Sequence, residues 1–166
     1  MTVPADMEIE RKFLVSEAPP DLGGHPSSAL EQGYIAIHDD GTEVRIRRRD
    51  GASILTVKSG GGLVRVEEEF PVDDAVFERL WPLTDGRRLQ KVRHLVPAEP
   101  PGRVIEVDVY DGALAGLVVA EVEFASEDDA RAFAPPPWLG REVTGDPRFK
   151  NQSLAVDGVP ADVAAS

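Results

Sequence analysis

Charged side chains recur at every second position in several short segments of this chain, and their types could hold a metal ion and an anion. The acidic members are Glu8, Glu10, Glu67, Glu69, Glu106, Asp108, Glu121 and Glu123. The basic members are Lys12, Arg45, Arg47, Arg49, Lys58, Arg65, Lys91 and Arg93. Carboxylate oxygens suit hard divalent cations, whereas guanidinium and ammonium groups suit phosphate or carboxylate.

A spacing of two is typical of a β-strand, so the charges share one face of each strand and apolar residues occupy the other. For a single strand, a solvated face of an antiparallel sheet explains the pattern. Across seven strands together, however, the face holds almost only ionisable groups, and several strands carry one sign at neighbouring positions. Such neighbours lie roughly 7 Å apart and repel each other. A bound counter-ion would offset the repulsion, which favours an enclosed ligand site.

The charged face is balanced in sign. Its eight acids and eight bases sum to zero, so the net charge of −12 lies elsewhere on the chain. Eight antiparallel strands are also about the number that closes into a barrel wide enough for one small ligand. We therefore predict an α+β protein: an eight-stranded antiparallel β-barrel, or tunnel, with a charged lumen and flanking helices on its apolar outer walls.

Eight strands with this alternation are expected, separated by clusters of Pro and Gly. They are placed at 7–15, 33–38, 42–50, 53–58, 63–70, 88–96, 103–110 and 118–125. The Asp39-Asp40-Gly41 and Asp50-Gly51 steps mark hairpin turns between adjacent strands.

Two helices are predicted outside the barrel. One should begin near Asp73 or Asp74, and the other should follow Ser126, whose spacing to Asp129 resembles a capping box. Residues 1–155 would form the tunnel domain. Residues 156–166 are small and acidic and are expected to form a flexible C-terminal tail.

Composition excludes several other classes of protein. With 166 residues and 42% hydrophobic content, the chain fits one domain with a real core. It has no cysteine and three histidines, which argues against disulfides, thiol catalysis and a zinc site built from such ligands. No apolar run is long enough to span a membrane, and no secretion signal is evident, so a cytoplasmic protein is expected. The negative net charge argues against a nucleic-acid partner.

At Glu8-Ile9-Glu10-Arg11-Lys12-Phe13 the sequence resembles the CYTH family, also called triphosphate tunnel metalloenzymes, whose hallmark is Glu-x-Glu-x-Lys near the N-terminus. Later motifs follow the family in order, including Gln32-Gly33-Tyr34, Val44-Arg45-Ile46-Arg47, Thr56-Val57-Lys58, Lys91-Val92-Arg93, Glu106-Val107-Asp108, Glu121-Val122-Glu123 and 138–146. The similarity covers about residues 6–155 and is strongest to the short bacterial, single-domain members.

The resemblance implies a tunnel fold and hydrolysis or cyclisation of triphosphates with Mg²⁺ or Mn²⁺. It implies metal binding by Glu8, Glu10, Asp108, Glu121 and Glu123. Three further acids are accessory candidates: Glu67 and Glu69 could bind metal or orient arginines, and Glu106 is expected to form a salt bridge or support the metal ligands.

The same resemblance, with the chemistry of the bases, implies a cradle for the triphosphate. Its members would be Lys12, Arg45, Arg47, Lys58, Arg65, Lys91 and Arg93. Lys91 has two interpretations. Among arginines and partly desolvated, it could be neutral and act as the base that activates water. Alternatively, it is one more charged phosphate contact.

The expected reaction is hydrolysis of the terminal phosphate of inorganic tripolyphosphate, or of a related organic triphosphate such as a nucleotide or thiamine triphosphate. Tyr34 and Tyr110 are the obvious aromatic candidates to stack on a ring, so a purely ionic lumen favours the inorganic substrate. An adenylate cyclase of the same fold and a non-catalytic polyphosphate- or nucleotide-binding module are the alternatives. No membrane partner is expected, and the chain would be a monomer or a homodimer.

Overall fold

Eight antiparallel strands form one sheet in the computed structural model, which describes residues 9–59 and 66–164. The strands are β1 (Ile9–Leu14), β2 (Ser27–Ile37), β3 (Glu43–Arg49), β4 (Ala52–Lys58), β5 (Glu67–Val72), β6 (Arg88–Ala98), β7 (Arg103–Asp111) and β8 (Val118–Phe124). Their order is β1-β8-β7-β6-β2-β3-β4-β5, and every pairing is antiparallel. All eight predicted strands are therefore present, but β2 begins six residues earlier than predicted and β5 ends two residues later. Residues 7–8 and 63–65 of the predicted strands lie outside the described residues.

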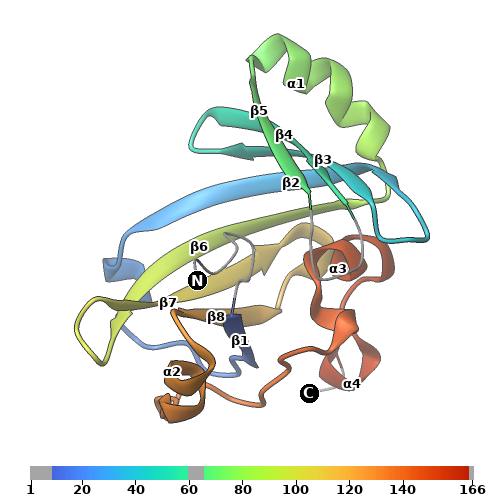
Figure 1. The fold of residues 1–166 in the computed structure, drawn as a ribbon. Helices are drawn as coiled ribbons and strands as arrows, with labels where there is room; N and C mark the ends of the chain where they lie inside the picture. The colour runs from blue at the N-terminus through green and yellow to red at the C-terminus, as the bar shows by residue number, and fades with distance from the viewer. Residues whose placement is uncertain (1–8, 60–65, 165–166) are drawn as a thin grey trace, which may run out of the picture.

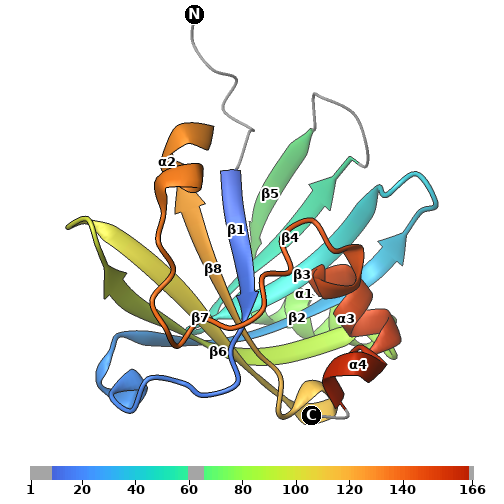
Figure 2. The same cartoon turned by 90° about the horizontal axis from the view of Figure 1, so that it is seen from below.

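The sheet curls without closing. Figure 1 shows β3, β4 and β5 above β7, β8 and β1, so the two ends of the sheet face each other across an interior, and Figure 2 shows the same arrangement from below. In the described part of the chain no pairing joins β1 to β5, whereas the sequence predicts a closed barrel.

The free edge of β1 is occupied by a later segment, which explains the open sheet. The backbone N–H of Leu14 donates to the carbonyl of Arg141 at 2.9 Å, and that of Val143 donates to the carbonyl of Lys12 at 2.8 Å. Since β8 takes the other edge of β1, no hydrogen-bonding edge remains for β5 along Lys12–Leu14. The segment therefore replaces the pairing that would have closed the ring.

Helices cover the apolar outer walls, as predicted. α1 (Asp74–Leu80) begins at Asp73, whose side chain accepts from the N–H of Val76, and α2 (Glu127–Ala132) begins at Ser126, whose hydroxyl accepts from the N–H of Asp129. Phe77 of α1 is buried beneath the guanidinium of Arg48 in β3.

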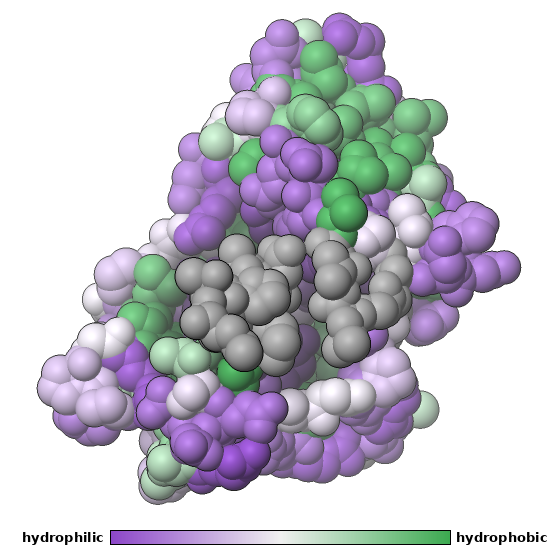
Figure 3. Space-filling model, in the orientation of Figure 1, coloured by the Kyte–Doolittle hydropathy of each residue, from purple (hydrophilic) through white to green (hydrophobic). Residues whose placement is uncertain are grey.

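A second apolar wall lies outside β1, β7 and β8. Phe13, Ile105 and Val122 pack there with Phe133, which follows α2. Part of the outer surface is not covered by helices, since Val57 on β4 and Phe70 on β5 are 37% and 49% exposed. Figure 3, in the orientation of Figure 1, shows apolar residues gathered on the upper part of the molecule.

The C-terminal part differs from the tail that the sequence predicts. It contains α3 (Asn151–Asp157) and α4 (Ala161–Ala164), after the short 3-10 turn Pro147–Phe149. Val159 and Val163 pack against the cluster formed by Leu154 and its neighbours. Three other 3-10 turns lie at Leu22–Gly24, Trp81–Thr84 and Gly112–Leu114. None of the described helices is long and apolar enough to cross a membrane.

Candidate active site

The interior of the curled sheet holds a cavity of about 540 Å³, and each of the eight strands contributes at least one side chain to its lining. Asp108 of β7 is fully buried and does not line the cavity itself. The predicted site residues that line it are Glu10, Lys12, Arg45, Arg47, Lys58, Glu67, Glu69, Lys91, Arg93, Glu106, Glu121 and Glu123. Glu8 and Arg65 lie outside the described residues. The charged faces therefore turn inward together, as the alternation predicts.

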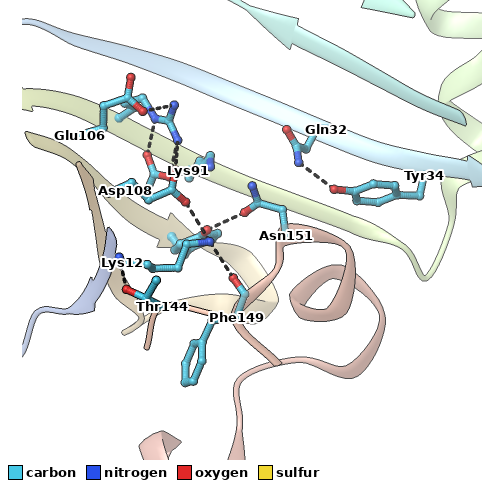
Figure 4. Close-up of polar contacts among 12 residues, drawn as sticks. Lys12, Gln32, Tyr34, Lys91, Glu106, Asp108, Thr144, Phe149 and Asn151 are labelled. Atoms are coloured by element: carbon cyan, nitrogen blue, oxygen red, sulfur yellow. Dashed lines mark hydrogen bonds and ion pairs between the residues drawn. The ribbon is translucent and has the colours of Figure 1, made fainter. Parts of the chain in front are cut away.

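Asp108 lies at the centre of the best-connected polar cluster (Figure 4). Its carboxylate is fully buried and accepts from Lys91 Nζ at 2.6 Å and from Arg93 Nε and Nη2 at 2.7 and 2.8 Å. Burial alone would raise the pKa of Asp108, but the hydrogen bonds and positive charges of Arg93 and Lys91 outweigh it and lower that pKa. Both oxygens of Asp108 therefore accept hydrogen bonds from the two bases. The metal-binding role that the resemblance implies for Asp108 stays a prediction.

Lys91 is 3% exposed yet borders the cavity. Burial lowers the pKa of Lys91; Asp108 opposes that shift, and the nearby charge of Arg93 adds to it. Its ammonium also lies 5.4 Å from the ring centre of Tyr110. A buried lysine with a lowered pKa, held by a carboxylate at the edge of a cavity, has the geometry of an acid–base group.

Carboxylates face one another across neighbouring strands in two places. Glu10 lies directly opposite Glu123, and Glu106 lies directly opposite Glu121. Like charges in register repel, and a cation would relieve the repulsion. Burial raises the pKa of Glu106; Arg93 opposes it, while Asp108, Glu121 and Glu123 add to it.

Hard oxygen donors therefore line this wall, and their chemistry suits Mg²⁺ or Mn²⁺. Within residues 9–59 and 66–164, however, no three acidic or histidine side chains converge closely enough to form a ready-made metal cluster. Some are also engaged by bases: Glu106 pairs with Arg93 Nη1 at 2.5 Å and Glu121 with Lys12 Nζ at 3.1 Å.

The opposite wall is rich in bases. Burial and the neighbouring charge of Arg45 lower the pKa of Arg47, while Glu69 opposes the shift from 3.9 Å. Lys58 pairs with Glu67 at 3.4 Å. The Nε of Arg45 is buried and has no hydrogen-bond partner among residues 9–59 and 66–164. A buried, unsatisfied guanidinium nitrogen beside a second arginine is suited to an anion.

Glu67 and Glu69 thus lie against bases, which matches the orienting role that the sequence left open for them. Arg49 is exposed at the end of β3 and does not line the cavity.

The two candidate aromatic residues are buried in the walls. Tyr34 and Tyr110 are 1% and 3% exposed. Gln32 Nε2 donates to the hydroxyl of Tyr34 at 3.2 Å, and the hydroxyl of Tyr110 donates to Asn151 Oδ1 at 2.7 Å (Figure 4). Neither ring presents a face on which a nucleobase could stack.

Several cavity residues were not assigned to the site from the sequence. They are Leu30, Gln32, Gly41, Glu43, Ser59, Lys150, Asn151 and Gln152. Glu43 lies on the same predicted strand face as Arg45 and Arg47, so alternation could have found it, whereas Gln32 precedes the predicted strand 33–38. The three residues that begin α3 carry no such signal, because only the tertiary fold brings them to the cavity.

Comparison with known proteins identifies the family. The chain is 48% identical over 149 residues to an inorganic triphosphatase of Nitrosomonas europaea, covering 90% of this chain and 97% of that protein. It is 40% identical to an inorganic triphosphatase of Acetivibrio thermocellus, covering 89% and 92% of the two chains. The crystal structure of an inorganic triphosphatase matches with a TM-score of 0.76 and 43% identity over 90% of this chain and 95% of that one.

A more distant structure shares the fold alone. It is a Hippeastrum protein proposed to be an adenylyl cyclase, which shows a dominant triphosphatase activity, with a TM-score of 0.51 and 16% identity over 75% of this chain and 83% of that one. No family model matches the chain. The fold, a curled sheet around a charged cavity, and these relatives define a triphosphate tunnel protein. The chain belongs to the CYTH, or triphosphate tunnel metalloenzyme, family, among its inorganic triphosphatases.

Proposed function

We propose that this protein hydrolyses the terminal phosphoryl group of inorganic tripolyphosphate in a reaction that requires Mg²⁺ or Mn²⁺. The observation that carries the proposal is the pairing of two walls in one cavity: carboxylates in register on β1, β7 and β8, and bases on β3 and β4. The relatives named inorganic triphosphatase at 48% and 40% identity support it. A small polyanion with its metal ion complements both walls.

The bases would bind and orient the phosphate chain. Arg45 and Arg47 would grip pairs of oxygens, and Lys58 would act as a point charge from the same side. Lys12 and Arg93 would approach from the other side. Phosphoryl transfer needs little beyond positioning and stabilisation of charge, so this cradle would supply much of the rate enhancement.

The metal would be held by Glu10, Glu121 and Glu123, with Glu8 beyond the described residues. When bound, a divalent ion neutralises phosphate charge and makes water a better nucleophile. Glu106 and Asp108 would act on the bases instead, since each is engaged by Arg93.

Lys91 would accept the proton of the attacking water. It is buried at the cavity edge, and burial lowers its pKa. Asp108, 2.6 Å away, would orient the amine and stabilise the ammonium that forms. Arg93 would keep Asp108 ionised through its two hydrogen bonds.

Phosphate release from tripolyphosphate and from ATP, measured beside formation of cyclic nucleotide, separates the candidate functions. We expect metal-dependent release from tripolyphosphate, much slower release from ATP and no cyclic product, because neither buried tyrosine can stack on adenine. Cyclic AMP formation would identify a cyclase. Binding of tripolyphosphate without turnover, at any metal concentration, would identify a non-catalytic module.

A further inference from the structure

One end of the cavity is closed by the chain's own C-terminal part. Along β7, Glu106 lines the cavity, whereas Tyr110, four residues or roughly 13 Å further along the strand, does not. At Tyr110 the interior becomes apolar, because its ring packs with Leu154 of α3 and Leu114. A linear phosphate chain lying in the cavity would therefore have to terminate at this end.

Asn151, the first residue of α3, lines the cavity at this closed end. Its side-chain oxygen accepts from the buried hydroxyl of Tyr110 at 2.7 Å. Figure 4 shows the amide nitrogen directed away from that contact, toward the interior between Lys91 and Gln32. Tyr110 thus uses the acceptor of the amide and leaves two N–H donors for the cavity.

The surroundings of this amide favour an anion as its partner. Lys150 and Lys91 line the same cavity. The hydroxyl of Tyr110 is buried, and its donation to the oxygen of Asn151 fixes which end of the amide faces the cavity. A neutral donor among lysines adds directional recognition where further charge would only add repulsion.

We infer that Asn151 is a substrate-binding residue whose amide N–H groups donate to an oxygen of the terminal phosphoryl group, and that Tyr110 is the positioning residue that fixes the amide. This inference rests on the proposed function, since the ligand is tripolyphosphate. It adds an uncharged recognition group to the cradle, supplied by α3 and not by a strand.

Three substitutions test the assignment: Asn151→Ala, Asn151→Asp and Tyr110→Phe. Each variant would be measured for KM and kcat with tripolyphosphate and Mg²⁺, for Kd of tripolyphosphate without metal by calorimetry, and for Tm. Ser153→Ala is the matched control, because it changes α3 at a residue that does not line the cavity.

Asn151→Ala should raise KM and Kd about 10-fold or more, the effect of losing a hydrogen bond to a charged acceptor. Asn151→Asp keeps the acceptor for Tyr110 but turns a carboxylate toward the phosphate, so it should weaken binding further, about 100-fold. Tyr110→Phe should weaken binding a few-fold, and adding it to Asn151→Ala should cost nothing more in KM, because the two residues act through one contact.

The inference is overturned if Asn151→Ala and Asn151→Asp both bind tripolyphosphate within two-fold of wild type. It is equally overturned if Asn151→Asp matches wild type while Asn151→Ala does not, because the amide oxygen would then face the cavity. Should Asn151→Ala have a strongly lowered Tm, the aspartate variant decides. Wild-type protein that neither binds nor hydrolyses tripolyphosphate refutes the proposed function and this inference together. Active wild type with unaffected variants refutes the inference alone.

Discussion

At the scale of single residues, the cluster of Asp108, Lys91 and Arg93 shows that two acids of one strand can have different environments and partners. Glu106 and Asp108 are two positions apart on one strand and are equivalent by alternation. In the structure, Asp108 is fully buried under two bases, whereas Glu106 borders the cavity and, within the described part of the chain, pairs with Arg93. The sequence could place both acids inside the tunnel, but their separate partners depend on side chains from β6, which sequence spacing does not encode.

Lys91 gives a prediction in pH. As a base it must be neutral, and its pKa is lowered from 10.5, so the rate should rise with pH and level off below the pH at which an ordinary lysine titrates. Lys91→Arg should be nearly inactive and lack the rise, because arginine stays charged. The pH dependence of kcat for both proteins tests this. Substantial activity with an unchanged profile in Lys91→Arg would show that Lys91 is a phosphate contact.

Arg47 gives a prediction in affinity for the transition state. Arg47→Ala removes a charge-assisted, bidentate phosphate contact. It should reduce stabilisation of the transition state by roughly 2–4 kcal/mol, which lowers kcat/KM by about 30–1000-fold. Arg47→Lys should restore only part of the lost kcat/KM, since an ammonium group cannot reproduce the planar, forked geometry of a guanidinium. A fully active lysine variant would show that Arg47 supplies charge alone.

Glu123 separates stability from activity. It lies opposite Glu10 in register, so removing it relieves a repulsion. Glu123→Ala should therefore lose metal-dependent phosphate release while its Tm stays equal to or above that of the metal-free wild type. Near-normal turnover in this variant would remove Glu123 from the metal-binding set.

At the scale of elements, the strands and the two capped helices could be predicted because their signals are local. The alternation of charged and apolar residues predicted the strands, and the capping residues Asp73 and Ser126 predicted where α1 and α2 begin. The pairing of segment 140–143 with β1 is non-local and has no such signal, so a closed barrel was expected. α3 was missed because it has seven residues and no side-chain cap at its start.

The contact between β2 and the turn Trp81–Thr84 depends on a glycine. A Cβ on Gly33 would lie 2.5 Å from side-chain atoms of Thr84, which is itself fully buried. Gly33→Ala should therefore force the turn outward and lower the free energy of unfolding by about 1–3 kcal/mol. Thermal denaturation beside Gly24→Ala, whose added Cβ meets nothing within 4 Å, measures the difference. Equal Tm values for the two variants would contradict the tight packing.

At the scale of the whole molecule, the described residues that line the cavity include seven acids and seven bases, so the net charge of −12 lies elsewhere on the chain. An acidic exterior would repel a free polyanion, so the attraction must be local to the cavity and its metal. The ionic interior could be read from the sequence because period-two alternation survives in nearly every strand. Strand register decides which acids pair with bases and which acids lie opposite one another, and the register is known only from the folded sheet.

The central claim is that the facing carboxylates serve a catalytic metal. Phosphate release from tripolyphosphate by exhaustively chelated wild-type protein, followed by titration with Mg²⁺ or Mn²⁺, tests it most directly. We predict no turnover after chelation, full recovery with either ion, and poor recovery with Ca²⁺, whose longer and looser coordination would misplace the reacting groups. Full activity in the metal-free protein would contradict the account.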